Sequence, residues 1–149
     1  MYKKILVPLD GSKRAEHILS HVENIARPHS AEVILLQVVI LPIISDGYKS
    51  ILLDETRRKS LRIFEESLAY LRAVERKFQK KGIRTHKFCE NGPVVDSILK
   101  VAQREDVDLI AMASHGRRGL SRVFYGSVTA AILQSVDRPL LLVRSRKAL

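Results

Sequence analysis

The sequence predicts an α/β fold: one domain with a doubly wound, five-stranded parallel sheet and helices on both faces. Short apolar runs rich in Val, Ile and Leu alternate along the chain with longer segments whose apolar residues recur at helical spacing. These runs lack the alternation of polar and apolar residues that marks a half-exposed strand, as expected when helices cover both sides of a sheet. Strands that alternate with helices pair in parallel through right-handed crossovers.

The first third of the chain predicts a strand, a helix and a second strand. Lys3–Leu9 begins with an apolar run that closes at Pro8, and turn-forming residues follow it. Ser12 is a candidate N-cap for a helix that runs to about Ala26, where Arg27-Pro28-His29 ends it. Glu32–Val39 is apolar without clear alternation and predicts the second strand.

The middle of the chain predicts one long helix and a third strand. Apolar residues keep helical spacing from about Ile51 to Lys81, and Gly82 follows as the C-cap. A helix of this length reaches ~45 Å, which exceeds what a small sheet needs. We therefore expect its first part to project or to pack on a partner. Arg84–Cys89 predicts the third strand.

The last third repeats the alternation twice. Pro93 suits the first turn of a helix that reaches about Arg104. Leu109–Ala113 predicts the fourth strand, Ser127–Ser135 the last helix and Leu140–Val143 the last strand. No linker, low-complexity segment or internal repeat divides the chain, so residues 1–149 are expected to form one domain.

The composition favours a cytoplasmic protein. The 149 residues are 46% hydrophobic and 28% charged, which is ordinary for a soluble domain. The longest apolar run is too short to span a bilayer, and no signal-peptide core follows the first residues. Cys89 is the single cysteine, which excludes an internal disulfide.

The net charge of +10 raises the possibility of a nucleic-acid partner. Much of the excess lies along the long helix, where basic residues are interleaved with glutamates. Such a pattern is typical of a solvated helix face, so no specific nucleic-acid partner and no membrane partner are expected. Nucleic-acid binding through this helix stays open as an alternative, although few aromatic residues accompany its cations.

The stretch from Leu109 to Thr129 carries the clearest functional signal. An apolar strand leads into a loop rich in glycine and arginine, and the loop ends where a helix begins. Exposed N–H groups and the positive end of a helix dipole bind phosphate in such arrangements. Gly116 and Gly126 allow a close backbone approach, and Ser127 is a candidate N-cap. Three arginines add positive charge beside the loop: Arg117, Arg118 and Arg122.

This stretch resembles the universal stress proteins, whose nucleotide-binding members carry G-x2-G-x9-G-[ST] after the fourth strand. The matching positions are Ala113, Gly116, Gly126 and Ser127. The resemblance extends over nearly the whole chain, from residues 5–12 to residues 139–143. Ala113 departs from the pattern, and its methyl group is expected to narrow the space beside a nucleotide.

The resemblance implies an adenine-nucleotide-binding regulatory or stress-response protein, with ATP as the expected ligand. It also implies the strand order 3-2-1-4-5 and a homodimer that pairs through the last strand. An apolar strand at a sheet edge would otherwise invite aggregation, which independently favours a partner. A regulatory protein partner is expected but not identified. Mg²⁺ would arrive with the phosphates rather than in a protein cage.

By resemblance, the nucleotide site draws on three parts of the chain. Asp10 would bind the ribose, although it could instead be a turn aspartate. Pro8, Val38 and Met112 would line the adenine, although Met112 alone would be assigned to the core. The expected nucleotide-binding set is Pro8, Leu9, Asp10, Val38, Met112, Ala113, His115, Gly116, Arg117, Gly126, Ser127, Val128 and Thr129.

No catalytic residue is predicted. His115 has no carboxylate or nucleophile at a readable spacing, so slow ATP hydrolysis is the most that is expected. His17 and His21 lack a third ligand and favour exposed helix positions over a metal site. A nucleotide-free dimeric interaction module and a weak ATPase stay open as alternatives, and so does a purely capping role for the first residues of the last helix.

Overall fold

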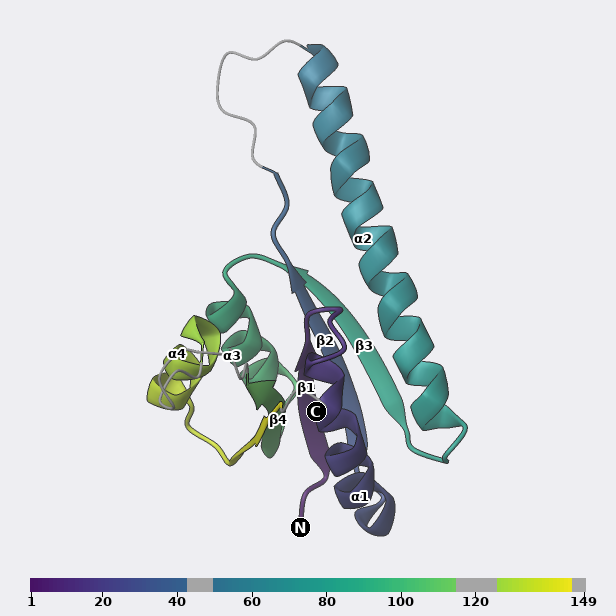
Figure 1. Ribbon diagram of the computed structural model, residues 1–149, viewed down its shortest axis with the longest axis vertical. Coiled ribbons are helices and arrows are strands. Elements are labelled where there is room, and N and C mark those ends of the chain that lie inside the picture. Colours follow the sequence, from purple (N-terminus) through teal and green to yellow (C-terminus); the bar gives the residue numbers. More distant parts are fainter. Residues whose placement is uncertain (43–49, 115–125, 146–149) are drawn as a thin grey trace.

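The computed structural model describes residues 1–42, 50–114 and 126–145. Five strands form one parallel sheet in the order β3-β2-β1-β4-β5, which is the order that the resemblance implies (Figure 1). The strands are β1 (Lys4–Leu9), β2 (Glu32–Val39), β3 (Thr85–Asn91), β4 (Leu109–Ser114) and β5 (Leu140–Arg144). The helices are η1 (Ala15–Ile18, a 3-10 turn), α1 (Leu19–His29), α2 (Ser50–Gln79), α3 (Val94–Arg104) and α4 (Ser127–Ser135).

Two hydrophobic clusters hold the helices on opposite faces of the sheet. On one face, alternate residues of β1 such as Val7 pack with Leu71 and Phe78 of α2, and this set is the α1/α2-side cluster. On the other face, Leu6 packs with Ile98 of α3 and neighbouring residues of α4, and this set is the α3/α4-side cluster. Each central strand therefore buries both of its faces, which explains why its sequence shows no polar alternation.

The first helical segment differs from the prediction at both ends: it opens with the 3-10 turn η1, and α1 begins only at Leu19. Ser12 does accept a hydrogen bond at the start, from the Ala15 N–H at 3.1 Å. However, the helix does not stop near Ala26, because α1 includes Arg27 and Pro28 and runs to His29. Pro28 lies in the last turn, and the chain leaves the helix at Ser30, whose φ of 52° is left-handed. Pro28 has no N–H, so α1 lacks one helical hydrogen bond in this turn.

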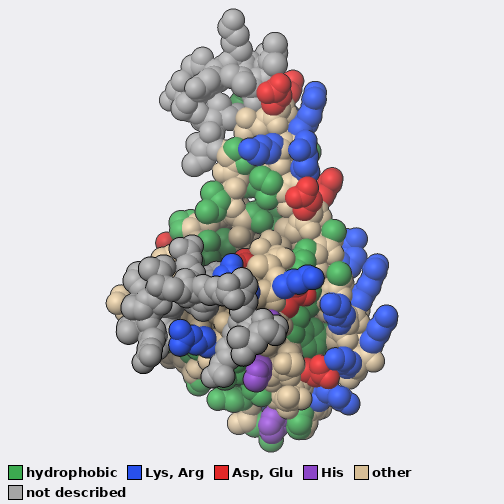
Figure 2. Space-filling model, in the orientation of Figure 1, with side chains coloured by type: hydrophobic (Ala, Val, Ile, Leu, Met, Phe, Trp, Pro, Cys, Tyr) green, Lys and Arg blue, Asp and Glu red, His purple; other side chains and the backbone are tan. Residues whose placement is uncertain are grey.

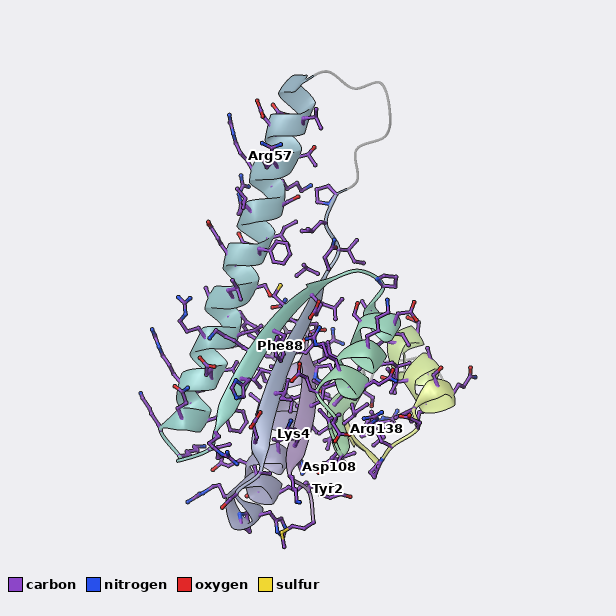
Figure 3. The ribbon with its side chains drawn as sticks, turned by 180° about the vertical axis from the view of Figure 1, so that it is seen from behind. Tyr2, Lys4, Arg57, Phe88, Asp108 and Arg138 are labelled. Atoms are coloured by element: carbon purple, nitrogen blue, oxygen red, sulfur yellow. The ribbon has the colours of Figure 1, made fainter. Side chains whose placement is uncertain are left out.

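Helix α2 extends beyond the sheet, as its length predicted. Its carboxyl half covers the sheet with buried Leu71, Val74 and Phe78, whereas its amino half projects past the strands (Figure 1). Leu61 on the projecting half is 56% exposed, and Arg57 lies on the same half, away from the sheet (Figure 3). Among the described helices, neither α2 nor any other is long and apolar enough to cross a bilayer.

The pairing of β1 with its two neighbours is unequal. With β2, β1 pairs over six positions, from Lys4 to Leu9, whereas with β4 the register covers only Ile5 and Leu6. The Lys4 carbonyl accepts a 3.0 Å hydrogen bond from the Asp108 N–H, so even-numbered positions of β1 face β4. Pro8 is one of these positions and has no N–H to donate. The predicted strand range Lys3–Leu9 therefore agrees with β1 along β2, whereas pairing with β4 stops before Pro8.

At the end of the sheet where the strands begin, side chains form hydrogen bonds with backbone groups. The two carboxylate oxygens of Asp108 accept hydrogen bonds from the N–H groups of Lys3 at 2.8 Å and Lys4 at 3.2 Å. Arg138 donates from Nη1 to the carbonyls of Ala102 at 2.9 Å and Val107 at 2.8 Å. Lys4, Asp108 and Arg138 all lie toward this end of the sheet (Figure 3). The amino ends of β1 and β4 are thus joined firmly, while their carboxyl ends are not paired.

Replacing Asp108 with alanine should destabilise the fold without unfolding it. Two backbone N–H groups lose their acceptor, so the free energy of unfolding should fall by about 1–3 kcal/mol. Denaturant unfolding measures this loss. Asp54→Ala, which removes an exposed carboxylate from the projecting half of α2, is the matched control and should change stability by less than about 0.5 kcal/mol. Equal losses of stability in the two variants would contradict a stabilising role for the hydrogen bonds to Asp108.

Candidate nucleotide site

Three of the expected adenine-lining residues lie on one face of the sheet, near the carboxyl ends of adjacent strands. Met112, which is 6% exposed, and Val38 both belong to the α3/α4-side cluster. Pro8 follows Leu6 by two positions in β1, so its ring lies on the same face. It is half-buried, as is Val38. The three come from β1, β2 and β4, which are neighbours in the sheet.

These residues surround the point where the strand order reverses. The chain passes from β1 outward to β2 and β3 on one side, and to β4 and β5 on the other. In open α/β sheets, ligands bind beyond the carboxyl ends of the strands at such a point. Because β1 and β4 are not paired past Leu6, backbone groups of both strands are available at this position.

Asp10 immediately follows β1 and forms a tight turn. Its Oδ1 accepts hydrogen bonds from the Ser12 N–H at 2.9 Å and from the Ser12 hydroxyl at 2.5 Å. Gly11 between them has a φ of 85°, which favours glycine. Asp10 is thus a turn aspartate, as the alternative interpretation holds. No described residue donates to its Oδ2, and the side chain is exposed, so it can also bind a ligand hydroxyl.

The start of α4 differs from the prediction. Gly126, not Ser127, occupies the N-cap position, and its carbonyl accepts a 3.1 Å hydrogen bond from the Ala130 N–H. Gly126 has a φ of 76° and a ψ of 155°, a conformation nearly restricted to glycine. Ser127 is the first helical residue and makes no capping hydrogen bond. A serine cap fails here because the backbone enters the helix through a conformation that serine disfavours.

The first N–H groups of α4 are available to an anion as far as the described residues show. Such groups have no partner within a helix, and among residues 1–42, 50–114 and 126–145 no side chain caps those of α4. Ser127 is exposed, whereas Thr129 is only 4% exposed and Val128 packs in the α3/α4-side cluster. That cluster also contains Met112, so the first turn of α4 is anchored on the sheet face that carries the adenine-lining set.

Two of the predicted residues face the other side of the sheet. Leu9, which is 4% exposed, and the half-buried Ala113 both pack in the α1/α2-side cluster. The methyl group of Ala113 is therefore directed away from the face of Pro8, Val38 and Met112. This placement does not support the expected narrowing of the space beside a nucleotide. His115, Gly116 and Arg117, together with Arg118 and Arg122, lie outside the described residues.

One contact near the site had no sequence signal. Ser145, which follows β5, is 3% exposed, and its N–H donates to the Ser114 carbonyl at 3.2 Å. Its hydroxyl lies 3.1 Å from Nδ1 of His17 in η1. Ser145 thus connects the end of β5 to the end of β4 and to the turn that follows Asp10. Only the folded chain brings these residues together, because 128 positions separate His17 from Ser145.

Two described residues, Cys89 and Tyr70, have titratable groups whose pKa is raised. Burial raises the pKa of the Cys89 thiol, which makes it a weaker nucleophile at neutral pH. Burial also raises the pKa of the Tyr70 hydroxyl, and the nearby charges of Glu16 and Asp10 add to this shift. The Tyr70 hydroxyl is buried without a partner among the described residues. Those residues contain no group of three or more potential His, Cys, Asp or Glu metal ligands.

Comparison with known proteins agrees with this geometry. The sequence pattern of the universal stress protein family matches residues 1–144. The chain belongs to the universal stress protein family. Universal stress protein MJ0577 of Methanocaldococcus jannaschii is 30% identical over 160 residues, covering 99% of this chain and 98% of that protein. Its solved structure matches with a TM-score of 0.82 and covers 99% of each chain.

Two more distant members of the family with the same fold contain nucleotides. One is a universal stress protein in complex with cAMP, with a TM-score of 0.68 and 19% identity over 97% of this chain and 98% of its own. The other is a universal stress protein family protein from Arabidopsis thaliana with AMP bound. Its TM-score is 0.65, with 18% identity over 97% of this chain and 92% of its own. At these identities the similarity establishes the shared fold.

Replacing Pro8 with alanine tests why β1 and β4 stop pairing. Alanine restores an N–H that faces β4, so we expect the new amide of residue 8 to form an interstrand hydrogen bond. Its hydrogen exchange should then be slowed by about the same factor as that of buried sheet amides. Ser12→Ala, beyond the strand, is the control and should leave the exchange of sheet amides unchanged. Free exchange at residue 8 would show that another feature separates the strands.

Replacing Ala113 with glycine distinguishes packing from ligand exclusion. The methyl group packs against the α1/α2-side cluster, so its removal should lower the free energy of unfolding by about 1–2 kcal/mol. Nucleotide affinity should change by less than about twofold, because the methyl group faces away from the adenine-lining residues. Calorimetric titration and denaturant unfolding measure the two quantities. A clear gain in affinity would restore the narrowing hypothesis.

Proposed function

We propose that this universal stress protein binds an adenine nucleotide, with ATP as the expected ligand, and acts as a regulatory or stress-response protein. The observation that carries the proposal is the start of α4. Its open N–H groups follow a glycine in a conformation that other residues disfavour, and its first turn packs in the same cluster as Val38 and Met112. A helix N-terminus of this kind binds phosphate.

The remaining parts of a nucleotide match residues around this helix. Pro8, Val38 and Met112 offer an apolar surface for the adenine, and the thioether of Met112 suits a flat ring. Asp10 can accept hydrogen bonds from ribose hydroxyls through its exposed carboxylate. The AMP and cAMP complexes of the two family members with this fold support adenine as the base. Mg²⁺, if present, would be held mainly by the phosphates.

Binding, rather than catalysis, is the proposed activity. Hydrolysis would require a group that activates water within reach of the terminal phosphate. The described residues near α4 offer hydroxyl groups and N–H donors, but no paired acid and base. ATP occupancy would then act by changing which partner the protein contacts. Steady phosphate release above the rate of protein-free controls would favour the weak ATPase instead.

We further propose that two copies associate through β5. This strand lies at the edge of the sheet and pairs with β4 on one side, while no described strand pairs with its other side. Its apolar residues Leu140–Val143 are all only half-buried in the single chain. Pairing with a second β5 would satisfy the open backbone groups and cover this surface. Sedimentation or light scattering of the purified protein measures the expected dimer.

Identification of the nucleotide is the direct test. Freshly purified protein is denatured, and any released nucleotide is identified by absorbance and chromatography. Protein stripped of nucleotide is then titrated with ATP, AMP, adenosine and GTP. We expect ATP to bind more tightly than adenosine because of the phosphates, and more tightly than GTP because of the base. No heat of binding for any of the four would favour a nucleotide-free interaction module.

Replacing Gly126 with alanine should abolish or strongly weaken nucleotide binding. Alanine is strained at a φ of 76° and a ψ of 155°, so the start of α4 must shift, at a cost of about 1–3 kcal/mol in stability. Gly82→Ala is the matched control, because Gly82 has a φ of 77° and ends α2 at the opposite edge of the sheet. Both variants should lose thermal stability, but only Gly126→Ala should lose nucleotide binding. Equal affinity in all three proteins would contradict a role for Gly126.

A further inference from the structure

The outward side of the carboxyl half of α2 carries a dense array of cations, far from the candidate nucleotide site. Four residues define what we call the α2 basic face: Arg72, Arg76, Lys77 and Lys80. All four are exposed, and Figure 2 shows Lys and Arg gathered along this side of the molecule. Because an α-helix rises 1.5 Å per residue, Arg72, Arg76 and Lys80 follow one another every ~6 Å.

The charge of this face is not balanced by its surroundings. Glu75, on the same helix, is engaged by Lys87 at 2.9 Å, and Glu23 of α1 is engaged by Lys81 at 2.6 Å. The hydrogen bond from Lys81 lowers the pKa of Glu23, as expected for an ion pair. Among the described residues, no carboxylate lies within ion-pair distance of the four cations of the α2 basic face.

The projecting half of the same helix provides a contrast. Its four cations are flanked by four carboxylates, two before them and two after them in the sequence, so its net charge is zero. The cations are Arg57, Arg58, Lys59 and Arg62, and the carboxylates are Asp54, Glu55, Glu65 and Glu66. The last two carboxylates, Glu65 and Glu66, precede the first residue of the α2 basic face. A general preference for charged residues on a solvated helix would not concentrate positive charge on one half.

The α2 basic face is held rigidly by the opposite side of the helix. Leu71, Val74 and Phe78 are at most 4% exposed in the α1/α2-side cluster. The Ser67 hydroxyl donates to Oε1 of Gln37 in β2 at 2.8 Å, one turn before the face begins. Gly82 then ends the helix with a left-handed turn. The cations therefore project from a fixed rod, which preserves their spacing.

The helix dipole accounts for only part of this pattern. Cations in the last turn of a helix are stabilised by the negative end of the dipole, and Arg76 and Lys77 lie in that turn. Arg72 lies a turn earlier, where the effect has largely decayed. Lys80 follows the helix and extends the same line. The array is thus longer than dipole stabilisation requires.

The surroundings of the cations favour a regular phosphate backbone over other polyanions. The exposed large hydrophobic residues of the described chain are Met1, Ile40, Leu53, Leu61 and Leu133, and none lies on this half of α2. Insertion into a lipid surface would need such residues. Phe78 is buried and the Tyr70 hydroxyl is covered, so no aromatic ring is presented for stacking on single-stranded bases. The neutral outward positions Ala69 and Ala73 are small and exposed, which allows close approach.

We propose that the α2 basic face binds the phosphate backbone of double-stranded nucleic acid without reading its sequence. The three cations that span ~12 Å would lie along a stretch of backbone that holds about three to four phosphates per strand, since phosphates recur every ~3.4 Å of axis on each strand. Lys77 would contact the backbone from the flank of this line. The α2 basic face lies toward the end of the sheet where the strands begin. The candidate nucleotide site lies at the end where the strands finish, so it stays accessible.

The test measures the affinity of the full chain for a labelled DNA duplex of mixed sequence by fluorescence anisotropy. Four phosphate contacts predict a slope of log K against log salt of about −3 to −4. Between about 50 and about 200 mM salt, affinity should therefore fall by about 100-fold. A change of duplex sequence should leave affinity within about twofold, because the backbone carries no sequence information.

Two charge-matched variants test whether the α2 basic face is the surface that binds the duplex. Replacing Arg72, Arg76, Lys77 and Lys80 together with glutamine should remove most binding and flatten the salt slope. The control replaces Arg57, Arg58, Lys59 and Arg62 with glutamine, which changes net charge equally on the same helix, and it should retain affinity within about threefold. Circular dichroism confirms that α2 forms in both variants, and retained ATP titration confirms that the nucleotide site is unaffected.

Three outcomes would overturn the proposal. Equal loss in the two variants would show that only net charge matters. Tighter binding of a single strand than of the duplex would point to stacking surfaces rather than a backbone array. Binding to vesicles of anionic phospholipid, with none to the duplex, would assign the face to a membrane surface.

Discussion

The unequal pairing of β1 organises this protein. At their amino ends, β1 and β4 are joined by ladder hydrogen bonds and by the Asp108 carboxylate, which accepts two N–H groups. Toward their carboxyl ends the pairing stops, because Pro8 faces β4 without a donor. The reversal of strand order occurs at the same place. Pro8 in the first strand thus leaves backbone groups of two central strands unpaired at the position where open α/β sheets bind their ligands.

The same sheet separates the two proposed activities in space. The residues proposed to line the adenine and the start of α4 lie near the carboxyl ends of the strands, whereas the α2 basic face lies toward their amino ends. Helix α2 is fixed to the sheet by apolar residues spaced at helical intervals, so its outward side can carry charge without disturbing the core. The α1/α2-side and α3/α4-side clusters also explain why Ala113 and Met112, adjacent in sequence, contribute to different surfaces.

Much of the fold could be predicted because its signals are local. Glu32–Val39 and Ser127–Ser135 agree with the predicted boundaries, since each is an apolar segment bounded by turn-forming residues or glycine. The errors are also local, but they depend on backbone conformation. Pro28 was expected to end a helix that includes it in the last turn, and Ser127 was expected to cap a helix that Gly126 caps. In both cases residue preferences located the helix end to within a few residues, and the backbone φ angle determined which residue ends or caps the helix.

Sequence patterns alone predicted the five strands, the four α-helices and the family, because periodicity and glycine spacing are properties of short segments. The 3-10 turn η1 was not among the predicted elements. The tertiary structure alone decided which distant groups meet. The contacts of Ser145 with His17, of Asp108 with the start of β1, and of Arg138 with the end of α3 join residues separated by 36 to 128 positions. Such contacts depend on β1 lying between β2 and β4, and no local pattern in the chain specifies that neighbourhood. The side of the sheet on which Ala113 lies was likewise decided by the register of β4, because a shift of one residue would reverse it.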